Sequence, residues 1–293
     1  MNYNYWNDFL RFWKENYTLL KEGKDGLIDW ENPNKYERAV SFFSPVEESS
    51  YYSIEYMPEP WWGNSGNHPL HVVVMNFNRG DADAFQHFDK LSDEFKNMDY
   101  SEFIEKEVEA GEDSSFKRNN TWHYMRRAKP ILEGLKSIGI DLGENDGLKN
   151  YLGVQLMPWR MTNISNVNMY MNNNQEAMIK NSLLFAAESS KKVENDKLRN
   201  KVFCRESGTR IFKFLEGLKE NGVIKGFYVI KPNHSGIEYN GDFGRIENNP
   251  NSNFYIFRIE DIEDIDFVCL WGDEIMTAFP AAKDIGWIID NIL

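Results

Sequence analysis

The segment His71–Phe88, HVVVMNFNRGDADAFQHF, constrains the fold of this chain more than any other stretch. A short apolar run, Val72–Met75, is followed by a polar loop that contains Gly80, and apolar residues then return at helical spacing. These later residues are Phe85, Phe88, Leu91 and Phe95. The pattern predicts a buried parallel strand that leads through a tight turn into a helix. In such units ligands bind where the strand ends, beside the helix N-terminus, so we expect a binding site at residues 76–81.

Strands and helices alternate along the rest of the chain. Apolar runs that end in polar residues predict four parallel strands, at residues 71–78, 153–158, 201–205 and 226–231. Amphipathic segments predict helices that include residues 3–21, 175–191, 208–220 and 281–293. This alternation implies right-handed crossovers and helices on both faces of a parallel sheet. The expected fold class is therefore α/β, a three-layer α/β/α domain around a central four-stranded parallel sheet.

Three regions fall outside this alternation. Residues 27–70 carry five prolines and predict a long, irregular approach to the first strand. Residues 253–259 and 266–271 have the pattern of strands, and we expect them to extend one edge of the sheet. The acidic run between these two predicts a solvated connection rather than a metal site. Because the composition does not shift along the chain, we predict one domain, residues 1–293, with a helical and irregular N-terminal extension over about residues 1–70.

The balance of charge restricts the classes of partner. The chain has 33 basic and 46 acidic residues, a net charge of −13, and such a field repels phosphate backbones at long range. One local exception is a stretch in which basic side chains surround Trp122, His123 and Tyr124, which suits backbone contact and base stacking. Its candidate contacts to a nucleic-acid backbone are Lys117, Arg118, Arg126, Arg127 and Lys129. The alternative is a solvated helix face with Trp122 and Met125 turned inward.

Other sequence signals bound the location and the cofactors of the protein. Apolar runs such as Phe267–Trp271 are too short to span a bilayer, and the first residues lack the layout of a signal peptide, so we expect no membrane partner. Cys204 and Cys269 lie in apolar runs and are expected to be buried reduced thiols in a cytoplasmic protein. The histidines have no zinc-binding spacing and no phosphate-binding glycine motif is present, so we predict neither a metal nor a cofactor.

Polar residues follow three of the predicted strands. Because the carboxyl ends of parallel strands meet at one edge of a sheet, we expect residues 78–80, 158–160 and 233–235 to converge there. An amide, a guanidinium, an imidazole and a hydroxyl together can bind a polar planar group or polarise a leaving oxygen. Two adjacent tryptophans before the first strand either close an edge of the core or form an aromatic wall beside this site. The candidate residues are Asn78, Arg79, Gly80, Trp159, Arg160, Asn233, His234 and Ser235, with Trp61 and Trp62 as the wall.

These motifs resemble those of the uracil-DNA glycosylase superfamily. Its members end the first core strand in a Gly-x-Asn-Pro-Gly-type or Gly-x-Asp-Pro-type loop. They end the fourth in a His-Pro-Ser-like or Asn/Met-Pro-Ser-like loop. Here the first loop is Phe77-Asn78-Arg79-Gly80 and the second is Pro232-Asn233-His234-Ser235. The segment Glu59-Pro60-Trp61-Trp62-Gly63-Asn64 and the strand end Met157-Pro158-Trp159-Arg160 resemble those of uncharacterised relatives. The resemblance spans roughly residues 55–236 and implies the strand order 2-1-3-4.

The resemblance also implies roles for individual residues. Asn78 holds the attacking water through its carbonyl, His234 donates to an oxygen of the departing base, and one of the tryptophans named above stacks on the extruded base. Two departures from the family pattern matter: Arg79 stands where the family has proline, and the order of the fourth-strand motif is scrambled. Structural alternatives stay open, with Asn78 as a turn or helix-capping residue, His234 as an ordinary loop residue and Trp159 as core packing.

Two functions of different classes follow. The first is a glycosylase-like hydrolase that cleaves the N-glycosidic bond of uracil or a modified base in nucleic acid. The second is a catalytically lapsed protein of the same fold that binds a nucleobase-like ligand or a protein partner, which Arg79 and the acidic net charge favour. A hydrolase nucleophile at Ser207 is disfavoured, because the turn lacks the flanking glycines of a Gly-x-Ser-x-Gly elbow.

Overall fold

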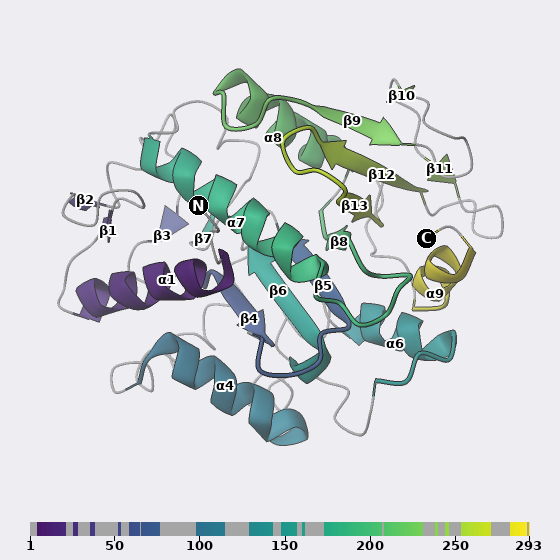
Figure 1. Ribbon diagram of the computed structural model, residues 1–293, viewed down its shortest axis with the longest axis horizontal. Coiled ribbons are helices and arrows are strands. Elements are labelled where there is room, and N and C mark those ends of the chain that lie inside the picture. Colours follow the sequence, from purple (N-terminus) through teal and green to yellow (C-terminus); the bar gives the residue numbers. More distant parts are fainter. Residues whose placement is uncertain are drawn as a thin grey trace.

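A computed structural model of the chain describes its residues in separate stretches. These are residues 5–21, 26–28, 36–38, 52–53, 59–64, 66–76, 98–114, 129–142, 148–156, 160–161, 173–206, 208–230, 238–239, 244–245, 253–270, 282–291 and 293. Within them the chain forms a mixed α/β fold built on one large sheet (Figure 1).

The described elements fall into helices, strands of the large sheet and two small strand pairs. The helices are α1 (Tyr5–Lys21), α4 (Tyr100–Ala110), α6 (Lys129–Ser137), α7 (Asn173–Ser190), α8 (Gly208–Glu220) and α9 (Ala282–Asn291), with 3₁₀ turns η2 (Gly111–Asp113) and η4 (Leu148–Asn150). The large sheet contains β4 (Trp61–Gly63), β5 (Val72–Asn76), β6 (Tyr151–Gln155), β8 (Lys201–Cys204), β9 (Phe227–Ile230), β10 (Glu238–Tyr239), β11 (Gly244–Arg245), β12 (Asn253–Ile259) and β13 (Asp266–Cys269). The small pairs are β1 (Gly26–Ile28) with β2 (Tyr36–Arg38) and β3 (Tyr52–Ser53) with β7 (Arg160–Met161).

Local sequence explains where several elements begin and end. The strands β5 and β6 are buried along their whole length, and each is non-polar up to its last residue, which is an amide. Helix α4 begins at a capping box, in which the Asp99 carboxylate accepts from the backbone of Ser101 and Glu102 accepts from the backbone N–H of Asp99. It ends at Gly111, whose φ of 51° suits a residue without a Cβ atom.

The large sheet has the order β10-β9-β12-β13-β8-β5-β6-β4, with β11 beside β12 (Figure 1). Strand β5 lies in the interior and runs parallel to both β6 and β8, so the first three predicted strands form a parallel core in the expected order. Strand β13 runs parallel to β8, and β12 runs antiparallel to both β13 and β9. Strand β9 therefore points the same way as β5 but lies four strands away from it.

The prediction that residues 253–259 and 266–271 extend an edge of the sheet is wrong. The prediction of a central four-stranded parallel sheet in the order 2-1-3-4 is wrong as well. Strands β12 and β13 do not extend an edge but insert between the third and fourth predicted strands, so the sheet is mixed and its parallel core does not include β9. The reason is visible in their burial, because Ile256, Phe257, Phe267 and Val268 are buried on both sides of the sheet. Strand β4 lies in the region predicted to be irregular, where it closes the other edge antiparallel to β6.

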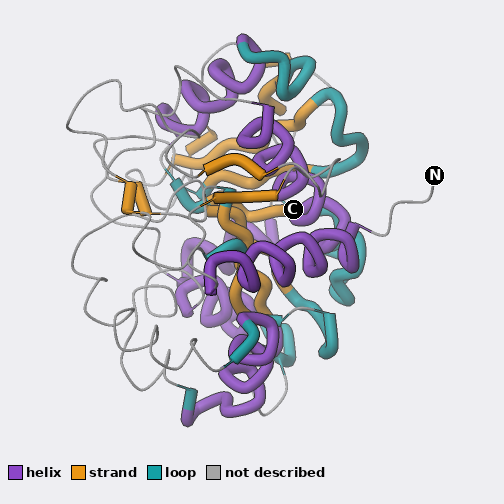
Figure 2. The backbone as a smooth tube through the Cα atoms, turned by 90° about the vertical axis from the view of Figure 1, so that its left-hand side faces the viewer, coloured by secondary structure: helices purple, strands orange, loops and turns teal. Residues whose placement is uncertain are grey.

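Helices α7 and α1 cover one face of the parallel core. Helix α7 contacts β5, β6 and β8, and α1 packs against α7. The ring of Phe9 stacks on Phe185 with centroids 4.0 Å apart and meets Trp61 edge-on at 5.8 Å. Figure 2 shows the strands running through the middle of the molecule with helices beside them. The first helix of the predicted N-terminal extension is thus part of the main core.

Helices α6 and α9 pack closely against each other. A Cβ atom added at Gly286 would lie 2.3 Å from Ser137 Oγ and 2.8 Å from the Gly134 carbonyl oxygen, so the glycine allows the helices to approach. In the stretches that the structure describes, the length and hydropathy of the helices do not reach what a bilayer crossing needs.

Candidate functional site

Buried polar residues gather where β5, β6 and β8 end. These three strands are neighbours and parallel, so their carboxyl ends share one edge of the sheet. The backbone N–H of Gln155 donates to the Pro60 carbonyl at 2.9 Å, and that of Arg205 donates to the Met75 carbonyl at 3.1 Å, which draws the flanking segments to the same edge. The buried polar residues there are Glu59, Asn76, Gln155 and Glu206, with Arg205 half-buried beside them.

Two of these residues form an amide pair, Asn76 and Gln155, at the last positions of β5 and β6. Their Cα atoms are register partners, so both side chains leave the same face of the sheet. Their exposed fractions are 1% and 0%. Neither the oxygen nor the nitrogen of either carboxamide has a hydrogen-bond partner. An unmatched buried amide costs on the order of 1–3 kcal/mol, so this pair lowers the stability of the ligand-free fold.

The amide pair faces away from α1 and α7. Because side chains alternate along a strand, Trp61 and Trp62 point to opposite faces, and Trp61 is the one that meets α1. Trp62 is the register partner of Gly153, which lies on the face of Gln155. A Cβ atom at Gly153 would lie 2.7 Å from the Trp62 ring, so the glycine lets the indole approach the strand closely.

Both tryptophans proposed as an aromatic wall are part of the core. Trp61 is 0% exposed and Trp62 is 1% exposed. Tyr100 donates its hydroxyl hydrogen to the Trp61 carbonyl and meets the indole edge-on at 4.9 Å. Tyr151 packs on Trp62 at 4.7 Å. The described surroundings match the alternative in which this pair closes an edge of the core, although Trp62 shares its face with the amide pair.

Cys204 and Cys269 lie beside each other on β8 and β13. They are register partners, and both are buried free thiols, as predicted from their apolar runs. Burial raises the pKa of Cys204 well above its ordinary value, and the neighbouring Cys269 raises it further. The Sγ of Cys269 contacts the Glu206 carbonyl oxygen at 3.4 Å. A thiol kept protonated in this way is a poor nucleophile, so we assign the pair to packing.

Most of the candidate residues predicted from the sequence lie outside the described residues. These are Asn78, Arg79, Gly80, Trp159, Asn233, His234 and Ser235, together with Lys117, Arg118, Arg126 and Arg127. Arg160 is placed by its backbone only, in β7, where it pairs with Ser53. Lys129 begins α6, and its Nζ lies 3.7 Å from a carboxylate oxygen of Glu133 one turn later.

The sheet order bears on the predicted convergence of the strand ends. Residues that follow β5 and β6 leave from neighbouring strands. The end of β9 lies on the same side of the sheet but four strands from β5, which corresponds to about 19 Å. The order 2-1-3-4 would have put it at half that distance. Four extended residues beyond Ile230 span at most about 13 Å, so His234 approaches Asn78 only if the two loops lean toward each other.

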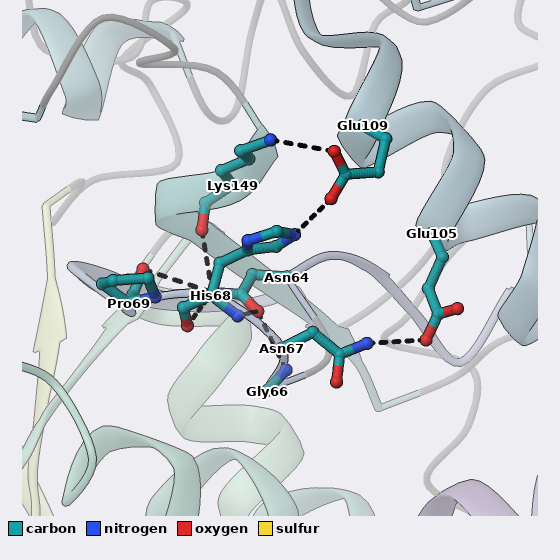
Figure 3. Close-up of polar contacts among 8 residues, drawn as sticks. All are labelled: Asn64, Gly66, Asn67, His68, Pro69, Glu105, Glu109 and Lys149. Carbon is teal, nitrogen blue, oxygen red and sulfur yellow. Dashed lines mark hydrogen bonds and ion pairs between the residues drawn. The ribbon is translucent and has the colours of Figure 1, made fainter.

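A second polar cluster lies at the opposite, amino end of the core (Figure 3). Glu109 of α4 lies 2.9 Å from His68 Nε2 and 3.0 Å from Lys149 Nζ, and Asn67 Nδ2 donates to Glu105 at 2.7 Å. At its centre the buried Asn64 side chain bridges three carbonyl oxygens and two backbone N–H groups. In the described part of the chain, groups of His, Cys, Asp and Glu do not form a metal-binding arrangement. We assign this cluster to holding α4 against the chain before β5.

Gln155 was not among the candidate residues predicted from the sequence, and Asn76 was predicted only as the start of a loop. A signal was present in both cases, because a primary amide ends an otherwise apolar, fully buried strand. The register that joins these two amides depends on the pairing of β5 with β6, which no local pattern specifies.

Comparisons of the chain with protein-family models, with curated proteins and with solved structures gave no match. The resemblance to the uracil-DNA glycosylase superfamily is therefore one of short motifs alone.

Proposed function

We propose that the carboxyl edge of β5, β6 and β8 binds a nucleobase and that the protein is a glycosylase-like hydrolase acting on the N-glycosidic bond of uracil or a modified base in nucleic acid. The observation that carries the proposal is the row of buried polar residues at this edge, with the amide pair Asn76 and Gln155 at its centre. An unmatched, buried amide pair is costly to a fold and suits a polar, planar ligand.

In the proposal the chemistry divides among residues that follow the strands of the sheet. Cleavage of the bond leaves a cationic sugar and an anionic base, so the site must orient a water molecule and stabilise the departing base. In the proposal Asn78, two residues beyond the end of β5, orients the water, and His234 donates a hydrogen bond to the base. The basic stretch over residues 117–129 supplies the contacts to the nucleic-acid backbone.

The test is release of free base from uracil-containing single- and double-stranded DNA at low salt. Replacing Asn78 by Ala should lower the rate by on the order of 10²–10³ because the water loses its anchor. Asn67→Ala is the matched control, since Asn67 is an exposed asparagine at the opposite end of the sheet, and it should leave the rate unchanged. An equal rate in wild type and Asn78→Ala, or no release from any of these substrates, contradicts the proposed hydrolase.

A specific observation favours the lapsed binding protein as the second candidate. The end of β9, which precedes His234, is four strands from β5 rather than two. The hydrogen-bond donor that a glycosylase needs, His234, therefore follows a strand that ends far from β5. In this case the free base binds without any cleavage of the nucleic acid, and His234→Ala leaves its affinity unchanged.

A further inference from the structure

We propose that Asn76 and Gln155 together bind one planar group that carries a hydrogen-bond donor beside an acceptor. They bind it whichever of the two neighbouring positions on the ligand holds the donor. The ligand class is then neutral heterocycles of both the keto and the amino type, rather than uracil-like rings alone. The inference rests on the proposed function for the location of the site, but it does not require that a bond be cleaved.

The first step concerns the cost of the two amides. Both side chains are almost completely buried, and all four of their polar side-chain atoms are unmatched. A buried amide without a partner destabilises a protein, whereas an apolar side chain of the same size fills the space without this penalty. Buried polar groups that break this rule are expected at functional sites. The pair is therefore better explained by a bound ligand than by folding.

The second step concerns reach. The two residues are register partners on neighbouring parallel strands, about 4.8 Å apart, and their side chains leave the same face. Each carboxamide offers two N–H donors and one carbonyl acceptor. A single small ring that lies across both carboxamides can therefore be bonded by both. Since the site is removed from water, each hydrogen bond made there is stronger than it would be at the surface.

The third step concerns polarity. When fixed neighbours hold the oxygen and nitrogen of an asparagine or glutamine side chain, the positions of its donor and acceptor are fixed. Such a side chain binds a ligand of one hydrogen-bonding polarity only. Neither Asn76 nor Gln155 has such a neighbour, so each can turn its terminal amide by half a rotation and present either the N–H or the C=O group. A lactam edge and an amidine edge are then matched equally well. The two amides are themselves neutral, so they match a neutral ring without a compensating charge.

The test is calorimetric titration of the full chain with two free bases, uracil and cytosine, which have similar size and opposite edge polarity. Both should bind, with Kd values within about tenfold of each other. The variants Asn76→Leu and Gln155→Met should each weaken both bases by roughly tenfold or more, and should also raise the Tm of the ligand-free protein. Leu156→Met, a volume-conserving change at the next residue along, should leave both affinities unchanged.

The outcomes separate this inference from the proposed function. Binding of uracil with cytosine at least about a hundredfold weaker means that the polarity is fixed, which overturns the inference but not the hydrolase. Unchanged affinities with a lowered Tm in both amide variants mean that the pair holds only structural water, which overturns it as well. Binding of neither base also overturns it. If both bases bind and DNA is not cleaved, the inference stands and the proposed hydrolase fails.

Discussion

Two buried asparagines in this protein are used in opposite ways. Asn64 and Asn76 are each 1% exposed. The Nδ2 of Asn64 donates to the carbonyl oxygens of His68 at 2.7 Å and Lys149 at 2.8 Å, and its Oδ1 accepts from the backbone of Gly66 at 2.8 Å (Figure 3). The side chain of Asn76 makes no hydrogen bond. Burial alone therefore does not tell a structural amide from a functional one, whereas the hydrogen-bond inventory does.

This contrast predicts that one substitution has opposite effects at the two positions. Asn64→Leu should lower the free energy of unfolding by about 3 kcal/mol or more, because it leaves several buried backbone groups without partners. Asn76→Leu should raise it by about 1 kcal/mol, because it removes an unmatched amide. Chemical denaturation of both variants measures the difference. A loss of similar size at both positions would mean that Asn76 also has a structural partner.

Glu109 predicts a pH dependence at the same end of the molecule. The hydrogen bond from Lys149, followed by the charges of Lys149 and His68, lowers the pKa of Glu109 below its ordinary value of 4.5. A carboxyl group whose folded pKa is lowered stabilises the fold above its unfolded pKa, and this stabilisation is lost as the pH falls through the folded value. The Tm advantage of wild type over Glu109→Gln should thus be present at neutral pH and shrink below about pH 4.5.

The effect of Glu109 should be small, because its side chain is 60% exposed and solvent screens the ion pairs. Glu105→Gln is the control. Glu105 lies on the same helix as Glu109 but accepts a hydrogen bond from the neutral amide of Asn67. Thermal melts of the three proteins across the acid range provide the measurement. An advantage of wild type that grows toward acid pH contradicts the assigned ion pairs.

At the scale of elements, the contact between α6 and α9 depends on the absence of side-chain atoms. Gly286 of α9 lies against Ser137 and Gly134 of α6, at distances that leave no room for a methyl group. Alanine normally favours a helix over glycine by about 1 kcal/mol. The close approach reverses this preference, because an added Cβ atom forces the two helices apart.

We therefore expect Gly286→Ala to lower the free energy of unfolding by about 1–3 kcal/mol despite its better helix propensity. The control in the same helix is Asp290→Ala, which removes only an exposed ion pair with Lys197 and should change stability by less than about 1 kcal/mol. Urea denaturation followed by circular dichroism compares the two. A stabilised Gly286→Ala variant would show that the helices can separate without loss.

At the scale of the whole molecule, local sequence patterns predicted the positions of helices and strands better than they predicted which strands pair in the sheet. The helix α8 has the bounds expected from its periodicity, and β5, β6 and β8 lie where their apolar runs indicated. The order of these three strands also agrees with the expectation. The position of β12 and β13 could not be predicted, because an apolar run specifies that a strand is buried but not which strand lies beside it.

The same limit applies to the candidate site. The edge of the sheet was predicted from the direction of the strands. The residues predicted to form the site, except Arg160, Trp61 and Trp62, lie outside the described stretches, and the buried polar residues found at this edge were not among them. The pairing of Asn76 with Gln155 joins positions far apart in the chain and depends on register, which the sequence of either strand alone does not contain. Conversely, two adjacent tryptophans are expected both in a packed core and at a site where a ligand stacks. The sequence therefore could not tell that Trp61 and Trp62 are buried in the core.

The insertion of β13 beside β8 has a consequence for synthesis of the chain. Lys201 and Asp266 face each other across this pairing, 65 residues apart. A nascent chain on the ribosome therefore completes β4, β5, β6 and β8 well before the second neighbour of β8 has been made. During that interval Val202 and Phe203 lie on an open edge with unpaired backbone groups. Until β13 has been made, we expect this edge to be a template on which another unfinished chain can pair.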